Sequence, residues 1–269
     1  MAYWARIFAL FGFCISNSTC PYVDMSHELF TGLPQYPGDN PFTLKTVHRG
    51  PFLDNPFIIM YDFEMPEHSG SHIDAPYHFF ESGWKVNEIP LERLVGPAVV
   101  LDIREKVNKT PSDEDTTVDI ADAEAWERKY GRIPNGAIVL MNSGNGKNWP
   151  NVTAYIGTEE HGDITKLRFA GFSPELAEWL VKERNIIGIG SDALSFDRGS
   201  SYVNYSVHNI ISPQNIWGLE NVANLDLIPE DGATVYVMPL KIRGGSGSPA
   251  RIFAKWNKRK LLKRRESRK

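Results

Sequence analysis

Four short apolar runs, each bounded by Gly, Pro or Asp, constrain most strongly what this chain can fold into. They are "PAVVLDI" (97–103), "GAIVLMNSG" (136–144), "IIGIGSD" (186–192) and "TVYVMPLKI" (234–242). Continuous apolar runs of this length are typical of strands that are buried on both faces, because such strands pack against other layers on each side. We therefore expect these four runs to form buried strands.

A further segment, "IIMYDFEM" (58–65), has an alternating pattern instead. Apolar and acidic side chains would point to opposite faces of an extended chain. The pattern predicts a half-buried strand that leads directly into a histidine-rich segment. The apolar face would hold Ile59, Tyr61, Phe63 and Met65, and the other face Asp62 and Glu64.

Two segments between the apolar runs have the start and stop signals of helices. The first begins near Asp122 with acidic residues and ends at Gly131, a common helix terminator. The second, "SPELAEWLVKERN" (173–185), offers Ser173 as N-cap and Pro174 at the first helical position, with an apolar stripe of Leu176, Trp179 and Leu180. Strands that alternate with helices predict a mixed α/β domain.

Glycine-rich "RGGSGSPAR" (243–251) follows the last predicted strand. It lacks the spacing of a P-loop or of a dinucleotide fingerprint, so we expect a turn rather than a phosphate site. "NSG" (142–144) follows another predicted strand and is expected to be a turn, with substrate binding as the alternative.

The charge distribution separates an acidic body from a basic C-terminal tail. Residues 255–269 carry nine Lys or Arg and one Glu, or +8, which leaves −12 for residues 1–254. An acidic body does not favour nucleic acid, and no apolar run is long enough to predict a stable membrane association. We expect residues 19–254 to form one domain and residues 255–269 to be a disordered, solvated tail; the alternative is a tail that contacts an anionic surface.

The N-terminus has the pattern of a secretory signal peptide over residues 1–18. One arginine precedes the apolar run 7–15, and small polar residues follow, with cleavage after Ser16 or Ser18. This pattern predicts passage through the secretory pathway. The alternatives are an amphipathic or frayed extension and a cytoplasmic protein. Four N-x-S/T sequons are compatible with secretion, at Asn17, Asn108, Asn151 and Asn204.

The segment "EHSGSHIDAPYHFF" (67–80) concentrates side chains that bind metals. It holds His68, His72 and His78, three of the seven histidines, together with Asp74. Two imidazoles and a carboxylate, from His68, His72 and Asp74, suit Zn²⁺ or Mn²⁺ and leave coordination positions open. His78 is placed to carry a proton instead, because a free imidazole titrates near neutral pH.

These residues do not have to lie on a helix. Gly70 and Pro76 disfavour one, and the proline biases Ala75 toward an extended conformation. In an extended segment His72 and Asp74 share a face. The segment therefore predicts a strand end that turns into a loop, with its metal ligands on one side.

The pattern His-x-Gly-Ser-His-x-Asp-x-Pro-x-His resembles the signature of the metal-dependent cyclase family, which includes bacterial kynurenine formamidases and isatin hydrolases. Most of the body shares the resemblance, in residues 23–39, 172–197, 207–229 and 243–251. It implies a swivelling β/β/α domain with a mixed sheet and flanking helices, assembled as a homodimer or a higher homo-oligomer. The signal peptide and the basic tail are not part of the family pattern.

The resemblance also implies a two-metal site. Its first ion would be held by His68, His72 and Asp74, with His78 as the catalytic histidine. A second ion would be held by His208 and Glu220, twelve residues apart, with Asp74 as the bridge. Isatin hydrolases carry Gln where this chain has Glu220. The carboxylate favours the formamidase-like arrangement, since it adds the negative charge that a second cation needs.

The activity implied is metal-dependent amide hydrolysis. The first expectation is an arylformamidase that converts N-formyl-L-kynurenine to kynurenine and formate in tryptophan catabolism. The alternatives are hydrolysis of a cyclic amide such as isatin, and a secreted member that binds a small aromatic molecule without catalysis. Aromatic residues that could hold an aryl substrate, or pack in the core instead, are Tyr77, Phe79, Phe80 and Trp84.

Overall fold

The computed structural model describes residues 20–111 and 115–266. Within these residues, eight strands form one mixed sheet in the order β1-β12-β11-β5-β7-β9-β10-β4. Strand β4 pairs with β12 as well as with β10, so all of these strands except β1 form a closed ring. The predicted mixed α/β fold, with a sheet and flanking helices, is confirmed.

The elements have the following bounds. The ring and its edge strand comprise β1 (Tyr22–Asp24), β4 (His72–Asp74), β5 (Val95–Asp102), β7 (Ile138–Asn142), β9 (Gly188–Ser191), β10 (Trp217–Glu220), β11 (Asp231–Pro239) and β12 (Gly247–Trp256). Two further pairs are β2 (Thr43–Phe52) with β3 (Asn55–Glu64), and β6 (Thr117–Val118) with β8 (Gly171–Phe172). The helices are α1 (Arg104–Lys109), α2 (Ile120–Tyr130), α3 (Val152–Ile156), α4 (Pro174–Glu183), α5 (Ser206–Ile211) and α6 (Lys258–Glu266).

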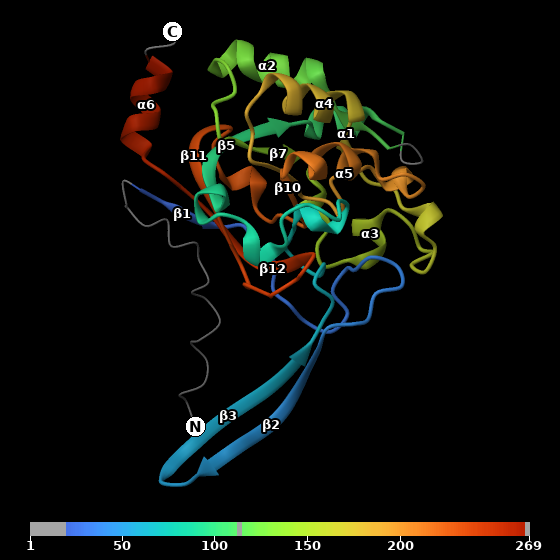
Figure 1. The fold of residues 1–269 in the computed structure, drawn as a ribbon, viewed down its shortest axis with the longest axis vertical. Helices are drawn as coiled ribbons and strands as arrows, with labels where there is room; N and C mark the ends of the chain where they lie inside the picture. Colours follow the sequence, from blue (N-terminus) through green and yellow to red (C-terminus); the bar gives the residue numbers. More distant parts are fainter. Residues whose placement is uncertain (1–19, 112–114, 267–269) are drawn as a thin grey trace, which may run out of the picture.

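The central strands are buried on both faces, as their apolar runs predict. Along β5, Ala98 and Val100 pack inside the ring, while Val99 and Leu101 pack outside it. Helices α2 and α4 cover the outer face (Figure 1). Successive strand residues point to opposite faces, so one continuous apolar run contributes to two cores.

Both predicted helices are present. Helix α2 begins at Ile120, because Asp119 accepts hydrogen bonds from two backbone N–H groups of the first turn, and it ends at Gly131. In α4 the Ser173 hydroxyl accepts from the backbone N–H of Leu176 at 3.1 Å, as expected of an N-cap.

The alternating segment 58–65 does form a strand, but its half-buried placement is wrong. It belongs to β3, which pairs only with β2 in an arm that projects from the body (Figure 1). The apolar face of this arm comprises Leu44, Phe57, Ile59, Tyr61 and Phe63, which are 38–59% exposed. Alternation shows that a strand has two unlike faces, but not which layer covers them.

The C-terminal part also differs from the prediction. The predicted last strand ends at Pro239, and the glycine-rich segment 243–251 is a turn only at its start, because β12 begins at Gly247. The domain boundary expected after Ala254 falls inside β12, and Lys258–Glu266 form a helix rather than a disordered tail. Residues 1–18, expected to be a signal peptide, lie outside the described residues. None of the described helices is long and apolar enough to cross a membrane.

We predict that Gly218→Ala destabilises the protein by about 1–3 kcal/mol, the usual cost of overpacking a core. A Cβ atom at Gly218 would lie 2.0 Å from Cε1 of Phe196, whose backbone N–H points at Glu220. Chemical denaturation measures the change. Gly162→Ala is the matched control, because a Cβ atom there meets nothing within 4 Å. Equal stability of the two variants would contradict the tight packing of β10 against Phe196.

Candidate metal centre

The site forms where β4 closes the ring. In the β4–β10 pairing His72 lies opposite Glu220, and Asp74 lies opposite Gly218. On its other side Asp74 lies opposite Gly247 of β12. Since alternate residues share a face, His72 and Asp74 point to one side while the residue between them packs in the core. The predicted strand end is confirmed.

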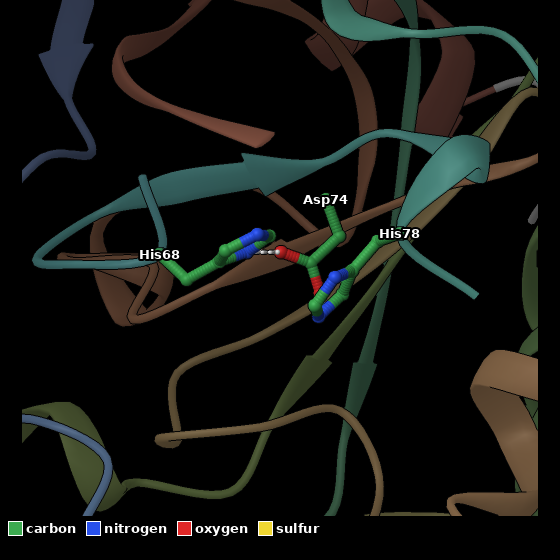
Figure 2. Close-up of side chains that lie close together, drawn as sticks. All are labelled: His68, Asp74 and His78. Atoms are coloured by element: carbon green, nitrogen blue, oxygen red, sulfur yellow. Dashed lines mark hydrogen bonds and ion pairs between the residues drawn. The ribbon is translucent and has the colours of Figure 1, made fainter. Parts of the chain in front are cut away.

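One half of the site contains His68, Asp74 and His78 (Figure 2). His68 Nδ1 lies 2.6 Å from Asp74 Oδ1, and the His68 and His78 rings stack with centroids 4.0 Å apart. His78 comes from a single helical turn that begins at Pro76. A Cβ atom at position 247 would lie 2.5 Å from His68 Cε1, so Gly247 leaves the space that this imidazole occupies.

The outer nitrogen of His68 is already engaged. The Ser246 hydroxyl donates to Glu67 Oε2 at 2.7 Å, so its oxygen accepts from His68 Nε2, 2.9 Å away. In a neutral imidazole this assignment leaves the Nδ1 lone pair directed at the Asp74 carboxylate. Two acceptors that face each other need a proton or a cation between them.

The other half contains His72, Asp74 and Glu220, all buried. His72 Nδ1 donates to the carbonyl oxygen of Gly70 at 2.9 Å. Its Nε2 then faces Asp74 Oδ1 at 3.1 Å and Glu220 Oε2 at 3.4 Å. This nitrogen is buried and lacks a hydrogen-bond partner among the described residues. This buried nitrogen and the two carboxylates that it faces together form a set of atoms suited to binding a cation.

His208, from α5, repeats the pattern. Its Nδ1 lies 2.6 Å from Asp197 Oδ2, so it donates to that carboxylate. Its Nε2 lies 3.1 Å from Asp74 Oδ2 and 3.6 Å from Glu220 Oε1. Backbone N–H groups of Val207 and His208 also donate to Asp197, which fixes this carboxylate. A carboxylate behind a ligating histidine typically sets its tautomer and orientation.

The pKa values show how strongly the carboxylates demand positive charge. Burial alone would lower the pKa of His72, but Asp74 and Glu220 outweigh it and raise the pKa to about 10. Burial likewise opposes Asp197 and Asp74 at His208, whose pKa rises to about 9. Burial would raise the pKa of Asp74, yet His68 and His208 hold it well below its usual value. Protons therefore sit where a divalent cation would fit.

His78 differs from these imidazoles. The residue reaches solvent at the mouth of the site, while its ring packs on His68 and on Phe79. Partial burial of the ring lowers the pKa of His78, against the smaller opposing effect of Asp74. The pKa falls to about 4, so the ring is neutral near pH 7 and a weaker base than a free imidazole.

The structure brings all six predicted site residues into one cluster. It groups them as His68, Asp74 and His78 on one side and His72, Asp74 and Glu220 on the other, with the ligand atoms of each group within 4.8 Å of one another. His208 lies beside the second group. The prediction grouped His68 with His72 and gave His78 no ligand role. In the structure His68 lies in one group with His78 instead, so its position makes His78 a further candidate ligand.

Three residues that support the site were not assigned a role from the sequence. They are Glu67, Asp197 and Ser246. Asp197 lies inside a segment that resembles the cyclase family, and Ser246 lies inside the glycine-rich segment. The contacts of Ser246 span 178 and 179 positions, and that of Asp197 with His208 spans eleven and depends on the placement of α5. In contrast, Ser143 of "NSG" donates to Asp192 at 2.6 Å and does not line this site.

A cavity of about 280 Å³ opens beside the cluster. Of the four aromatic residues expected near a substrate, only Phe79 lines it. The lining consists of Pro34, Gln35, Tyr36, Asp39, His68, Asp74, His78, Phe79, Leu194, Ser195, Tyr205, His208, Glu220 and Asn221. Lys and Arg are absent from this described lining, so the cavity combines apolar walls with carboxylates and imidazoles.

Comparison with known proteins identifies the family. Residues 23–198 match the family model described as "Putative cyclase". The chain belongs to the cyclase family. Among cyclase-family relatives, isatin hydrolase of Roseibium aggregatum is 32% identical over 209 residues, which cover 75% of this chain and 76% of that protein. Kynurenine formamidase of Bacillus cereus is 26% identical over 237 residues, 87% of this chain and 96% of that protein.

A solved structure agrees with this assignment. Isatin hydrolase A from Ralstonia solanacearum has a TM-score of 0.80 and 32% identity, with 88% of this chain and 92% of that chain covered. The named relatives are hydrolases with two different substrates. This cyclase-family chain therefore has candidate metal ligands and hydrolase relatives, while the relatives do not agree on a substrate.

We predict that Asp197→Asn weakens Zn²⁺ or Mn²⁺ binding about 10- to 100-fold, the usual effect of removing a carboxylate behind a ligating histidine. The amide can no longer act as a charged acceptor for His208 Nδ1. Calorimetric titration with each metal measures the affinity. Asp54→Asn, at an exposed position of the arm, is the matched control. Unchanged affinity in Asp197→Asn would show that His208 is not a ligand.

Proposed function

We propose that this protein is a metal-dependent hydrolase of the C–N bond of an aromatic amide, and that its substrate is N-formyl-L-kynurenine, cleaved to kynurenine and formate. The observation that carries the proposal is His72 Nε2, which is buried, has no hydrogen-bond partner among the described residues and faces the carboxylates of Asp74 and Glu220. A nitrogen that faces two carboxylates in this way is suited to binding a cation. The hydrolase names of the relatives supply the reaction class.

Two divalent ions, Zn²⁺ or Mn²⁺, are proposed because Asp74 divides the site. Its Oδ1 faces His68 and His72, and its Oδ2 faces His208. A carboxylate that points one oxygen to each half is suited to bridging. When bound, the ions would polarise the amide carbonyl and make water nucleophilic near neutral pH.

The residues of the chain supply the remaining steps. Neutral His78, at the mouth of the cavity, accepts the proton of the attacking water and returns it to the leaving nitrogen. Phe79 and Leu194 form the apolar walls against which an aromatic ring would rest. Ser246, which Glu67 orients, engages the outer nitrogen of His68, and Asp197 engages that of His208, so that the inner nitrogens would face the ions.

A cyclic amide such as isatin is the second candidate substrate, and specific observations favour it. The isatin hydrolases match this chain at up to 32% identity, above the 26% of the formamidase from B. cereus. The described lining also lacks a lysine or arginine to pair with the carboxylate of an amino acid substrate. Glu220 favours the formamidase. A binding protein without catalysis is the third candidate; the complete set of His78 and metal ligands argues against it.

We predict that metal-stripped protein is inactive and that Zn²⁺ or Mn²⁺ restores hydrolysis of N-formylkynurenine. His78→Gln is expected to lower kcat about 10²- to 10⁴-fold, because the proton carrier is lost. Metal content, measured on the same samples, shows whether His78 also serves as a ligand. The control is His161→Gln, an exposed histidine outside the site.

The same assay, run with isatin, separates the candidates. Turnover of isatin alone would replace the formamidase proposal with the cyclic-amide one. If the protein retains metal but hydrolyses neither substrate, the proposal of a binding protein without catalysis is the one that stands. Full activity after complete removal of metal would contradict all the metal-dependent proposals.

We further propose that the protein is a homo-oligomer and that the β2–β3 arm docks on a second copy. An isolated two-stranded ribbon is at best marginally stable in water. The apolar face of the arm is nevertheless exposed, and Leu44 pairs with Phe63 in its register. Exposed contiguous apolar side chains of this kind mark interaction surfaces. A second copy fits the assembly that the family resemblance implies.

We predict that the double change Tyr61→Asp and Phe63→Asp lowers the oligomeric state, because charge on the apolar face prevents its burial. Light scattering coupled to size-exclusion chromatography measures the mass. Asp62→Lys, between them on the opposite face, is the control. A monomeric wild-type protein, or a variant of unchanged mass, would exclude the arm as the contact.

Secretion remains a proposal that rests on residues 1–18 and on the four sequons. It is tested by N-terminal sequencing and glycosidase treatment of protein recovered from the medium of expressing cells. An intact N-terminus on intracellular protein would favour the cytoplasmic alternative. The absence of nucleic-acid binding and of stable membrane association stays a prediction.

A further inference from the structure

A pair of tyrosines lines the cavity together with the metal-ligand cluster. Tyr36 lies between β1 and β2, and Tyr205 directly precedes α5; their hydroxyl oxygens are 2.5 Å apart. The Tyr205 ring lies 5.4 Å from that of Phe79 and 5.9 Å from that of His208. The pair therefore faces the same space as the proposed substrate, beside an aromatic wall and a proposed metal ligand.

One of the two hydroxyl hydrogens of the pair is not used in the bond between them. Only one hydroxyl hydrogen can lie between the two oxygens, so the accepting hydroxyl keeps a hydrogen that points elsewhere. Within the part of the chain that the structure describes, neither hydroxyl has another hydrogen-bond partner. Burial and the bond to Tyr205 raise the pKa of Tyr36, which keeps its hydroxyl protonated. The pair thus presents a neutral donor to the cavity.

The backbone at Tyr205 supports a specific role. Its φ of 41° and ψ of 56° lie in the left-handed region, where a bulky side chain is strained. Asn or Gly would adopt this conformation more easily. Strained residues that are held by their surroundings concentrate at functional sites. With its backbone held in this conformation, Tyr205 places its hydroxyl against that of Tyr36.

The amide side chains of the lining are committed elsewhere. Gln35 donates to Ser69 and to the carbonyl of Asn40, and the Asn221 amide donates to the carbonyl of Gly70. The tyrosine pair is therefore a donor available to a substrate acceptor away from the scissile carbonyl.

We propose that the Tyr36–Tyr205 pair recognises the oxygen of a ketone group attached to the ring carbon next to the one that bears the amide nitrogen. This inference rests on the proposed function and names its substrate class, the ortho-acyl anilides. N-formylkynurenine and isatin both have this ketone, one in an open chain and one in a ring. A donor placed for it serves either substrate, while the scissile carbonyl faces the metal ligands.

The test compares N-(2-acetylphenyl)formamide with formanilide, which lacks the ketone. For wild type, Tyr36→Phe, Tyr205→Phe and the double variant, the ratio of the two kcat/KM values is measured on metal-loaded protein. The ketone also changes the intrinsic reactivity of the amide, but this effect cancels when ratios are compared between variants. Phe retains the ring packing, and metal content and thermal stability are checked for each variant.

Each single variant is expected to lower the ratio about 3- to 10-fold, the equivalent of one net hydrogen bond. The double variant should lose no more than the singles, since the two hydroxyls act as a unit. Tyr202→Phe is the matched control: it is the same change three residues away, at a side chain that does not line the cavity. Its ratio should equal that of wild type.

Equal losses on both substrates would show that the pair only ties two segments together, and would overturn the inference. A wild-type ratio in both single variants would overturn it as well. If wild type hydrolyses neither amide, the N-formylkynurenine assay decides the proposed function, and binding decides the inference. Calorimetry with 2-aminoacetophenone and with aniline should show a preference for the ketone that both variants lose; no preference, or an unchanged one, would overturn it.

Discussion

The double pairing of β4 is the constraint on which the rest of the structure depends. Three residues, His72 to Asp74, hydrogen-bond to β10 on one side and to β12 on the other. The ring closes at this point, and its closure fixes the side-chain alternation. Ile73 must enter the core, so His72 and Asp74 must both face the site. A shift of one residue would turn His72 and Asp74 into the apolar core and Ile73 out of it, which makes the register strongly specified.

The electrostatics of the site follow from that register. His68, His72 and His208 each engage one nitrogen with an acceptor outside the cluster and aim the other at Asp74. The inner groups are acceptors, and burial makes unneutralised acceptors costly. The protein stabilises this arrangement with protons on the imidazoles, or with cations in their place. The arrangement is poorly suited to a purely structural role, because apolar side chains would fill the same space at less cost.

The sequence predicted those features that local physics determines. Continuous apolar runs identified β5, β7 and β9, and Ser173 with Pro174 identified the start of α4. The histidine-rich segment identified the candidate ligands that lie near one another in the chain, while the family resemblance was needed for His208 and Glu220. Features set by distant contacts were missed. Asp197 looks like any turn carboxylate until α5 places His208 against it, and Gly247 reads as a loop glycine until β4 pairs beside it.

The β2–β3 arm also shows that a local sequence pattern does not determine what surrounds an element. Its alternation specified a strand correctly, but burial is a property of what lies beyond the strand, and in this chain the body does not cover it. The C-terminal tail was predicted from charge alone, which does not exclude a helix such as α6. In both places the local pattern was sound, and the surroundings decided the outcome.

Ring closure has a consequence for the order of events in synthesis. The hydrogen bond between His68 and Ser246 joins residues that are 178 positions apart, and β4 finds one of its two partners only in β12. During translation the histidine-rich segment is synthesised and leaves the ribosome long before Gly247 is added to the chain. Contacts of such sequence separation form slowly. The imidazoles of the nascent chain therefore remain without their final geometry until translation is nearly complete, so the centre matures as one of the last events of folding.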